Sequence, residues 1–208
     1  MVQADLYIDQ IDFLKYLPHL DCEECGVGTC QEFALKLKLR ELSFELCPHL
    51  TSSRKEAFRL VFEALDSLPQ IPASQMPTPG ITGVYEIGSP GHQSPVLVSG
   101  NSEYTQQAIL AVLFLYPHDC WMVFADSEGS TVDMAMIFGT FTAAKIKRIV
   151  SEHITERVTH RSLILPGLAA PLKEEAERLT GWRMSVGPIC AVELPLFLDQ
   201  AYPSAHTD

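Results

Sequence analysis

The chain is short of positive charge. Of its 208 residues, 15 are Lys or Arg and 26 are Asp or Glu, which gives a formal net charge of −11. No Lys or Arg lies between Leu60 and Ala144. Nucleic acids and anionic membranes are bound through clustered cations. We therefore expect no nucleic acid and no membrane among the partners of this protein.

Several functional signatures are also missing. No apolar run reaches about 18 residues, the length that a membrane-spanning helix needs. Residues 1–10 are acidic and have no basic region of the kind that opens a signal peptide. These features predict a cytoplasmic protein. The glycine motifs of dinucleotide- and phosphate-binding loops are absent, as is the G-x-S-x-G motif of hydrolases.

Four of the six cysteines are clustered with the spacing C-x2-C-x4-C-x16-C. They are Cys22, Cys25, Cys30 and Cys47. Cytoplasmic thiols stay reduced, so a cysteine cluster there usually binds metal or carries out redox chemistry. Thiolates are soft ligands, and four of them on a tight loop can hold a 4Fe–4S cluster. Gly26 and Gly28 allow the sharp turns that such a loop requires.

Zinc and a c-type haem also bind through closely spaced cysteines, but with other patterns. Zinc sites usually use two C-x2-C pairs, and only Cys22 and Cys25 have that spacing here. A c-type haem is excluded because Gly26 stands where its histidine would follow the pair. The remaining cysteines, Cys120 and Cys190, lie in apolar surroundings and are expected in the core. The spacing favours a 4Fe–4S cluster, with zinc as the alternative.

The first 67 residues predict a small helical module around these cysteines. Helices are expected at Ile11–Leu17, Gln31–Leu46 and Arg54–Leu68. In the helix expected at Gln31–Leu46, leucines recur at helical spacing and predict a buried face. They are Leu35, Leu39, Leu42 and Leu46. Residues 68–80 contain four prolines and predict an extended linker.

Residues 81–208 predict a second domain in which strands and helices alternate. The candidate strands are Ile81–Ile87, Pro95–Ser99, Trp121–Ala125, Ser162–Leu165 and Met184–Val186. The candidate helices are Glu103–Leu115, Val132–Phe138, Ala143–His153, Leu172–Leu179 and Leu194–Ala201. The first two strands are expected to pair through the turn at residues 88–94. The alternation predicts a Rossmann-like α/β domain with a mostly parallel sheet and helices on both faces.

Glycine, proline and small polar residues follow the predicted strands. Examples are Ser99-Gly100-Asn101 and Pro166-Gly167. In open α/β sheets, ligands bind beyond the carboxyl ends of the strands. Small residues there would let a large flat ligand approach the backbone, although glycine and proline also simply end strands.

Taken together, the two regions resemble a known family. The block from Tyr16-Leu17-Pro18 through the cysteines to Cys47-Pro48 is similar to the 4Fe–4S module of the large, gamma subunit of corrinoid iron–sulfur proteins in the acetyl-CoA decarbonylase/synthase pathway. The region from Ser94 to about Leu198 is similar to the corrinoid-binding domain of the same subunit, and includes Asp126-Ser127-Glu128-Gly129 and Val186-Gly187-Pro188.

The resemblance implies a 4Fe–4S cluster on the four clustered cysteines and a corrinoid (cobalamin) as second cofactor. The expected corrinoid-binding residues lie at or after the strand ends and in the helix before Gly139. They are Asn101, Glu128, Gly129, Met134, Met136, Gly139, Pro166, Gly167 and Gly187.

The chain also departs from the family. A TIM barrel separates the two blocks in the family, but the linker here is far too short for a barrel of roughly 200 residues or more. The family's cap helix has Trp and Lys where this chain has Met136 and Thr140. The D-x-H-x-x-G motif, whose histidine binds cobalt in other cobalamin domains, is missing. We therefore expect no histidine ligand to cobalt, and Met134 or Met136 either contacts cobalt weakly or only packs in the core.

These features predict a methyl carrier or electron-transfer protein of anaerobic one-carbon metabolism, in which the cluster reduces cobalt to Co(I). It would act as a component of a methyltransferase system rather than as a stand-alone enzyme. The expected partners are a methyltransferase or other corrinoid-using protein and a low-potential electron donor. The linker suggests a cluster module that swings between them. The alternative is an accessory protein of the same fold, such as a ferredoxin-like partner or a corrinoid-handling factor, without methyl transfer of its own.

Overall fold

The computed structural model describes residues 8–67, 76–116 and 118–202. The helices are α1 (Cys30–Lys38), α2 (Ser52–Ser67), α3 (Glu103–Leu115), α4 (Val132–Phe138), α5 (Ala143–His153), α6 (Lys173–Thr180) and α7 (Leu194–Ala201). The strands are β1 (Gly83–Ile87), β2 (Val96–Gly100), β3 (Cys120–Ala125), β4 (Ser162–Leu165) and β5 (Arg183–Val186). Short 3-10 helices occupy Ile8–Gln10, Phe13–Tyr16, Phe44–Leu46, Gly167–Leu172 and Ala191–Glu193.

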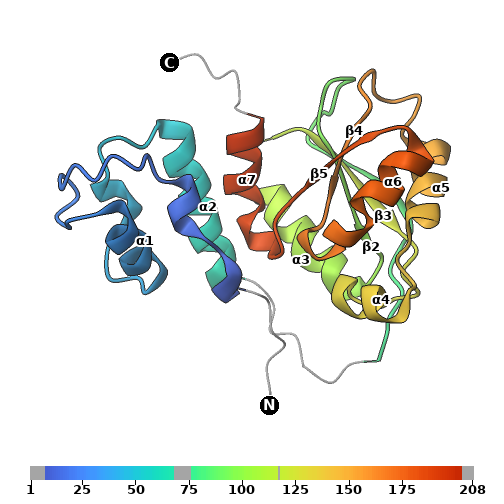
Figure 1. Cartoon of the computed structure of the whole chain (residues 1–208), viewed down its shortest axis with the longest axis horizontal. Coiled ribbons are helices and arrows are strands. Elements are labelled where there is room, and N and C mark those ends of the chain that lie inside the picture. The colour runs from blue at the N-terminus through green and yellow to red at the C-terminus, as the bar shows by residue number, and fades with distance from the viewer. Residues whose placement is uncertain (1–7, 68–75, 117, 203–208) are drawn as a thin grey trace.

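The five strands form one sheet in the order β1-β3-β2-β4-β5 (Figure 1). Strands β2 to β5 run parallel, and β1 joins the edge antiparallel to β3. The predicted pairing of the first two strands is therefore wrong. Every residue of β2 is buried, whereas most of β1 is partly exposed. The fully buried β2 thus takes a central position, where both of its edges are paired, and β1 takes the edge.

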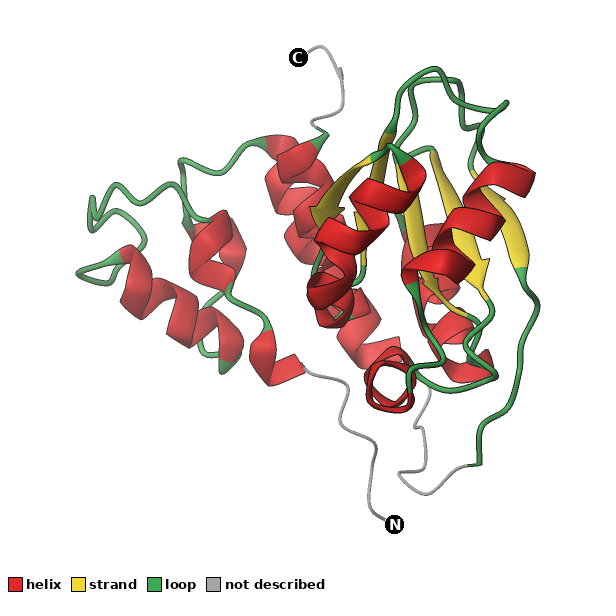
Figure 2. Cartoon of the chain, turned by 45° about the vertical axis from the view of Figure 1, so that its right-hand side comes forward, coloured by secondary structure: helices red, strands yellow, loops and turns green. Residues whose placement is uncertain are grey.

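Helices cover both faces of the sheet, as predicted (Figure 2). On one face, α3 and α7 pack over Leu97, Met122 and Ile164. On the other, α5 and α6 pack over Val98, Val123 and their neighbours. The expected α/β class and the mostly parallel sheet are thus confirmed. The described part of the chain contains no helix that is both long enough and apolar enough to cross a bilayer.

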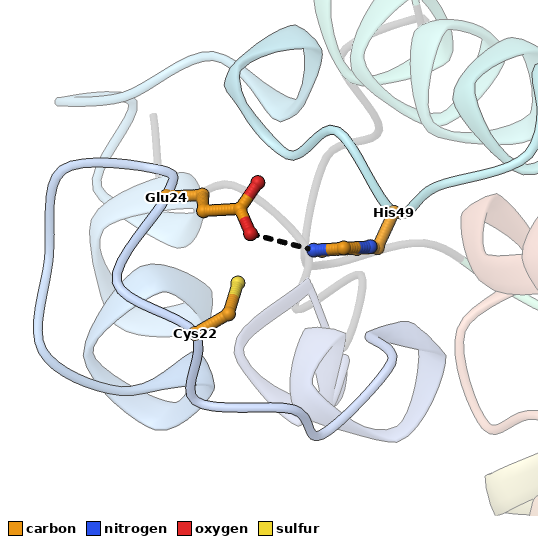
Figure 3. A group of neighbouring side chains, drawn as sticks. All are labelled: Cys22, Glu24 and His49. Atoms are coloured by element: carbon orange, nitrogen blue, oxygen red, sulfur yellow. Dashed lines mark hydrogen bonds and ion pairs between the residues drawn. The ribbon is translucent and has the colours of Figure 1, made fainter.

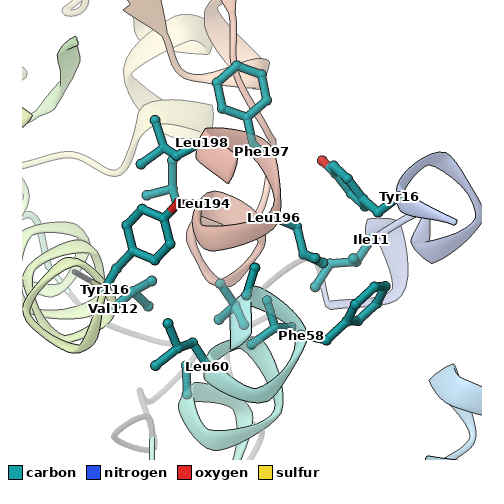
Figure 4. Close-up of a cluster of buried hydrophobic side chains, with 14 of the residues drawn as sticks. Ile11, Tyr16, Phe58, Leu60, Val112, Tyr116, Leu194, Leu196, Phe197 and Leu198 are labelled. Atoms are coloured by element: carbon teal, nitrogen blue, oxygen red, sulfur yellow. The ribbon is translucent and has the colours of Figure 1, made fainter. Parts of the chain in front are cut away.

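The helical region shares one hydrophobic core with the sheet domain. Helix α2 packs against α7 and α3, and its Phe58 and Leu60 belong to the same buried cluster as Leu196 and Val112 (Figure 4). Figure 1 shows α2 and α7 side by side, with α1 on the side away from the sheet. The expectation of a cluster module that swings freely is therefore not met in this structure. The helical region is docked on the sheet domain.

Two buried polar contacts reinforce this docking. The Arg54 side chain on α2 forms an ion pair with Asp199 on α7 at 2.5 Å, and Asp199 is 5% exposed. The Tyr16 hydroxyl donates a hydrogen bond of 2.5 Å to Glu193, just before α7. Burial raises the pKa of Glu193 above its ordinary value, even though the Tyr16 hydrogen bond lowers it. Partnered polar groups of this kind fix one relative position of the two regions, because each is costly to bury alone.

Helix α1 is shorter than the predicted helix at Gln31–Leu46. It ends at Lys38, and Arg40 adopts a left-handed conformation with φ of 59°. The Glu41 N–H then bonds the Lys36 carbonyl at 2.9 Å, which is the long bond of a Schellman motif. The buried side of α1 is formed by Phe33, Ala34 and Leu37. Of the leucines predicted to share a buried face, Leu35, Leu39 and Leu46 are exposed.

Residues 68–75 of the predicted linker at 68–80 lie outside the described part of the chain. Its last residues are held on the sheet domain. The Gly80 N–H bonds the Asn101 carbonyl at 2.6 Å, and the Glu103 N–H bonds the Thr78 carbonyl at 3.0 Å. The segment from 78 to 80 therefore follows the connection between β2 and α3 rather than standing away from the domain.

Candidate cofactor sites

The four clustered cysteines lie in the loop before α1, at the first residue of α1 and after the 3-10 helix that follows it. Cys22 and Cys25 occupy the loop before α1 and are partly exposed, whereas Cys30 is the first residue of α1 and is buried. Cys47 is buried and follows the 3-10 helix Phe44–Leu46. The first turn of a helix, where Cys30 lies, favours negative charge such as that of thiolates.

The surroundings of Cys47 suit a metal-bound thiolate. Burial raises the pKa of the Cys47 thiol, and the neighbouring Cys25 and Cys30 raise it further. The backbone N–H groups of His49 and Leu50 donate hydrogen bonds to its sulfur and lower the pKa. The three thiols therefore lie close enough to influence one another. N–H donors aimed at a sulfur stabilise the ionised form that metals bind.

The loop that carries Cys22 and Cys25 is held in a specific conformation. Asp21 accepts a hydrogen bond of 2.6 Å from the Cys30 N–H. Thr29 caps α1 by accepting from Glu32 N–H, and Glu32 accepts in turn from Gly28 N–H. This arrangement differs from a capping box in that Glu32 binds the N–H of the residue before the N-cap rather than that of Thr29 itself. It fixes the start of α1, and with it the position of Cys30 relative to the preceding loop.

A second group of metal-ligand types adjoins Cys22. The His49 Nε2 atom lies 3.4 Å from Glu24 Oε1, and the ligand atoms of Cys22, Glu24 and His49 all lie within 4.8 Å of one another (Figure 3). Glu24 and His49 are exposed, whereas Cys22 is partly buried. The sequence analysis did not include Glu24 or His49 in any site, because His49 is far from Glu24 in sequence.

The other two cysteines are buried, as predicted from their apolar surroundings. Cys120 is the first residue of β3 and is fully buried, and burial raises the pKa of its thiol to about 12. Cys190 is 3% exposed, precedes α7 and lines a pocket of the sheet domain.

A pocket of about 740 Å³ opens at the carboxyl ends of the parallel strands. Its interior is apolar and lies on the face of the sheet that α3 and α7 cover, with Leu97, Ile109 and Ile164 in its wall. Nearer the strand ends it is lined by Gly129, Pro166 and other residues of the connecting loops. Its volume is that of pockets that hold sizeable small molecules.

One polar atom in this pocket has no partner. Ser99 on β2 is 2% exposed, and its hydroxyl forms no hydrogen bond within the part of the chain that the structure describes. More than nine in ten buried polar groups in proteins are paired, and an orphan costs about 1–3 kcal/mol. Ser99 belongs to the pocket wall, but its hydroxyl oxygen has almost no surface open to the pocket, so a ligand would reach it only after a small local movement. The sequence analysis placed Ser99 at a strand end but did not count it in the site.

Asn101 organises the loops around the pocket rather than lining it. Its side-chain oxygen accepts hydrogen bonds from the N–H groups of Ser127 and Gly129, and its amide donates to the Gly80 carbonyl. Asn101 is 3% exposed. It therefore ties together the loops after β2 and β3 and the end of the linker.

The glycines predicted at the strand ends serve close packing of the chain itself. A Cβ on Gly129, which has φ of 76°, would come within 2.4 Å of Pro79. A Cβ on Gly167 would meet Ile189 at 2.7 Å, and one on Gly187 would meet Ile164 at 2.9 Å. Gly129, Gly187 and Pro166 line the pocket; Gly167 is not part of its lining.

The predicted residues around α4 fall into separate groups. Met134 is 40% exposed and lines the pocket, whereas Met136 packs against the core on the other face of the sheet. Gly139 ends α4 in a left-handed conformation outside the pocket lining. Glu128 is exposed and its carboxylate accepts a hydrogen bond of 3.1 Å from Lys145. Of the two methionines, Met134 alone lines the pocket.

Comparison with known proteins identifies the family. A family model described as "CO dehydrogenase/acetyl-CoA synthase delta subunit" matches residues 65–198, which is more than half of the chain. The chain belongs to this family. A second model, described as "Putative Fe-S cluster", matches residues 17–49 of this CO dehydrogenase/acetyl-CoA synthase family member, the stretch that holds all four clustered cysteines.

Similar proteins of archaea carry the name acetyl-CoA decarbonylase/synthase complex subunit gamma. The protein of Methanopyrus kandleri is 38% identical over 119 residues, which are 57% of this chain and 26% of that protein. The protein of Archaeoglobus fulgidus is 34% identical over 122 residues, which are 58% of this chain and 26% of that protein. The matched part of this family member thus spans about a quarter of the length of these relatives.

These matches confirm the resemblance to the gamma subunit. Only residues 50–64 separate the two matched stretches, so the family member is a short form without a TIM barrel between them. The predicted 4Fe–4S cluster and corrinoid agree with the matched families.

Proposed function

We propose that this protein carries a 4Fe–4S cluster on Cys22, Cys25, Cys30 and Cys47 and a corrinoid in the strand-end pocket. It serves anaerobic one-carbon metabolism as a methyl carrier or electron-transfer protein. The corrinoid supplies a cobalt that takes up and releases methyl groups once reduced to Co(I), and the cluster supplies the single electrons for that reduction. The observation that carries the proposal is the apolar pocket at the carboxyl ends of the parallel strands, in a chain of this family.

The residues of the chain have separate tasks in this proposal. The apolar wall of the pocket excludes water from the buried part of the ligand, and the Ser99 hydroxyl donates or accepts one orienting hydrogen bond. Asn101 keeps the loops after β2 and β3 in place beside the ligand. None of the described residues that line the pocket is a histidine, which agrees with cobalt that has no nitrogen ligand from this chain. Of the two methionines near the end of α4, Met134 lines the pocket, and its thioether could contact the cobalt weakly.

The cysteine site is suited to exchange electrons with an external protein. Cys22 and Cys25 are partly exposed, so one edge of a cluster there faces solvent. The N–H donors at Cys47 and the α1 N-terminus hold its inner side. We propose a low-potential electron donor as the partner at this edge and a methyltransferase or other corrinoid-using protein as the partner at the pocket.

The test is anaerobic purification of the full chain, followed by iron and sulfide analysis and by binding of cobalamin under reducing conditions. The expected result is about four iron atoms and one corrinoid per chain, with the sharp visible bands of the corrinoid added to the broad cluster absorption. The Co(II) form should show an electron paramagnetic resonance spectrum without nitrogen splitting. Nitrogen splitting that is lost when one histidine is replaced would contradict the absence of a histidine ligand.

A chain that binds the cluster but keeps no cobalamin after gel filtration would overturn the corrinoid proposal. That outcome would favour the accessory role without methyl transfer, in which the pocket serves another apolar ligand. Ser99→Ala provides a matched control for pocket binding, because it removes the hydroxyl with little change in side-chain volume and leaves the cysteine site untouched.

A further inference from the structure

Cys22, Glu24 and His49 bring three different metal-ligand side chains together at one edge of the cysteine site. One sulfur, one carboxylate oxygen and one imidazole nitrogen lie within 4.8 Å of one another (Figure 3). Cys22 and Glu24 lie on the loop before α1, and His49 lies on the segment after Cys47. In Figure 3 the three side chains point toward a common space. This donor set is different from that of the four cysteines, with which it shares only Cys22.

Glu24 and His49 form a long hydrogen bond or ion pair, and the spacing of the two atoms also matches a tetrahedral metal. Glu24 Oε1 and His49 Nε2 are 3.4 Å apart, which is longer than the usual 2.7–3.2 Å of a hydrogen bond. Bonds of about 2.1 Å from a tetrahedral zinc ion to nitrogen and oxygen place these two ligands about 3.4 Å from each other. The pair thus already has the separation that the ion requires, before any movement of the backbone.

The local backbone holds Cys22 and Glu24 on the same side of the loop. Glu23, between them, has φ of 64° and so adopts the left-handed conformation, which is unfavourable for a residue with a side chain. Glu23 itself is exposed and is not part of the group.

We propose that Cys22, Glu24 and His49 bind one divalent transition-metal ion such as Zn²⁺ when the chain lacks its cluster. Three protein ligands and one water complete a tetrahedral site of open type. Binding transfers the thiol proton of Cys22 to solvent, and the thiolate, carboxylate and neutral imidazole become the ligands. Because Cys22 cannot serve both groups, the ion and the 4Fe–4S cluster exclude each other. This exclusion rests on the proposed cluster; the binding of the ion does not.

The test uses the full chain freed of iron and sulfide by a chelator under anaerobic, reducing conditions. Zn²⁺ is titrated by competition with a metal indicator, and Co²⁺ serves as a spectroscopic probe of tetrahedral geometry and thiolate ligation. Wild type is expected to bind one ion with a thiolate-to-cobalt charge-transfer band. Glu24→Gln and His49→Gln should each weaken binding by at least about 10–100-fold, the loss typical for disturbed metal sites.

Matched variants separate this site from a site of four thiolates. Glu23→Gln and His19→Gln, at exposed positions of the same loop, should bind the ion as wild type does. Cys47→Ala should keep the single ion, whereas Cys22→Ala should lose it. If Cys47→Ala abolishes binding and Glu24→Gln and His49→Gln do not, the four cysteines hold the metal and the proposal is wrong. A wild-type chain that binds no Zn²⁺ also overturns it.

Cluster reconstitution distinguishes this result from the proposed function. Glu24→Gln and His49→Gln should accept iron and sulfide as wild type does, and Zn²⁺ bound beforehand should slow reconstitution of the wild type only. If no form of the chain accepts a cluster but the three-residue site binds Zn²⁺, the proposed function fails and this inference stands. Far-ultraviolet circular dichroism of each variant excludes loss of fold as the cause.

Discussion

Backbone N–H groups separate Cys47 from the equally buried Cys120. Burial raises the pKa of both thiols, and that of Cys120 reaches about 12. Cys47 differs because the N–H groups of His49 and Leu50 point at its sulfur. The same two donors would stabilise the negative charge of a thiolate bound to iron. Cys120 lies instead in a strand of the sheet, where its thiol is an inert part of the core.

Replacing Cys47 should therefore abolish cluster binding, and replacing Cys120 should not. In Cys47→Ala, the iron content is expected to fall from about four per chain to nearly none, because a cubane needs a ligand for each iron. Cys120→Ala, at an equally buried position, is the control and should keep its iron. The measurement is iron and sulfide analysis after anaerobic reconstitution. Equal loss in both variants would mean that damage to the core, and not loss of a ligand, removes the cluster.

The Ser99 hydroxyl should matter to the ligand but not to the empty protein. Removing an unpaired buried hydroxyl relieves its desolvation cost, so Ser99→Ala should unfold at the same or a higher urea concentration. With cobalamin bound, loss of one hydrogen bond of about 0.5–1.5 kcal/mol should weaken affinity by about 2- to 10-fold. Equilibrium dialysis and urea titration measure the two effects. Lower stability without change in affinity would show that the hydroxyl serves the fold.

At the scale of elements, the contact between α2 and α7 decides how the two regions are joined. Its apolar part comes from Phe58, Leu60 and Leu196, and its polar part from the Arg54–Asp199 pair. Both charges lie largely away from solvent. Removing one partner of such a pair leaves a buried charge without compensation, whereas removing both is far less costly.

Arg54→Met should consequently destabilise the protein by about 3–5 kcal/mol. Arg59→Met on the same helix is the matched control, because Arg59 is half-exposed and pairs with Glu56 and Glu63. That variant should lose less than about 1 kcal/mol. Urea unfolding followed by circular dichroism measures both. Similar losses in the two variants would show that the Arg54 pair is not buried in solution. The double variant Arg54→Met, Asp199→Leu should recover much of the loss.

Glu193, just before α7, should give the stability a distinct pH dependence. Burial raises its pKa above the ordinary value of about 4.5, so the folded protein holds this proton more tightly than the unfolded chain does. The stabilisation is thus present at low pH and is lost as the pH rises from about 4.5 through the higher folded pKa.

Glu193→Gln keeps an acceptor for Tyr16 and has no proton to lose. The variant should show a smaller fall of the unfolding midpoint as the pH rises above 4.5, and greater stability than wild type at neutral pH. Thermal unfolding at a series of pH values tests this. Glu156→Gln, at an exposed position, should retain the wild-type profile. Identical profiles for wild type and Glu193→Gln would refute the assignment.

At the scale of the whole molecule, the helical region and the sheet domain form one packing unit. A single buried cluster contains Phe33 near the cysteines, Phe58 on α2 and Leu97 in the sheet. In Figure 1, α2 and α7 lie between α1 and the sheet. The elements that carry the cysteines and those that line the pocket thus belong to different regions of this one unit.

A shared core predicts one cooperative unfolding transition. Thermal unfolding followed by far-ultraviolet circular dichroism and by Trp fluorescence should give the same midpoint, because Trp121 and Trp182 report on the sheet domain and the helices report on both regions. Arg54→Met should lower both signals together. Two separate transitions, with the helical signal melting first, would instead support a module that detaches and swings.

Local patterns determined most of the elements and pointed to the four clustered cysteines as the candidates for metal binding. The apolar runs and caps of the sheet domain fixed its strands and helices, because these depend on neighbours in the sequence. The spacing of the four cysteines indicated iron–sulfur chemistry for the same reason. Local patterns failed at the end of α1. The left-handed residue that follows this helix is Arg40, whereas a glycine at that position would have indicated the end. Leu42 and Leu46 were consequently assigned to a helix that had already ended, and Leu35, within α1, lies on its exposed side.

Contacts between distant segments were decided only by the tertiary structure. The pairing of β1 with β3 depends on which strand can tolerate an edge, and this emerges only when the whole sheet is assembled. Glu24 meets His49, and Ser99 lines a pocket with Cys190, because folding brings together residues far apart in the chain. The docking of α2 on α7 likewise rests on apolar surfaces. The periodicity of a sequence shows that such a surface is buried but not which element covers it. A sequence specifies which surfaces must be buried, and the packing of the complete chain specifies against what.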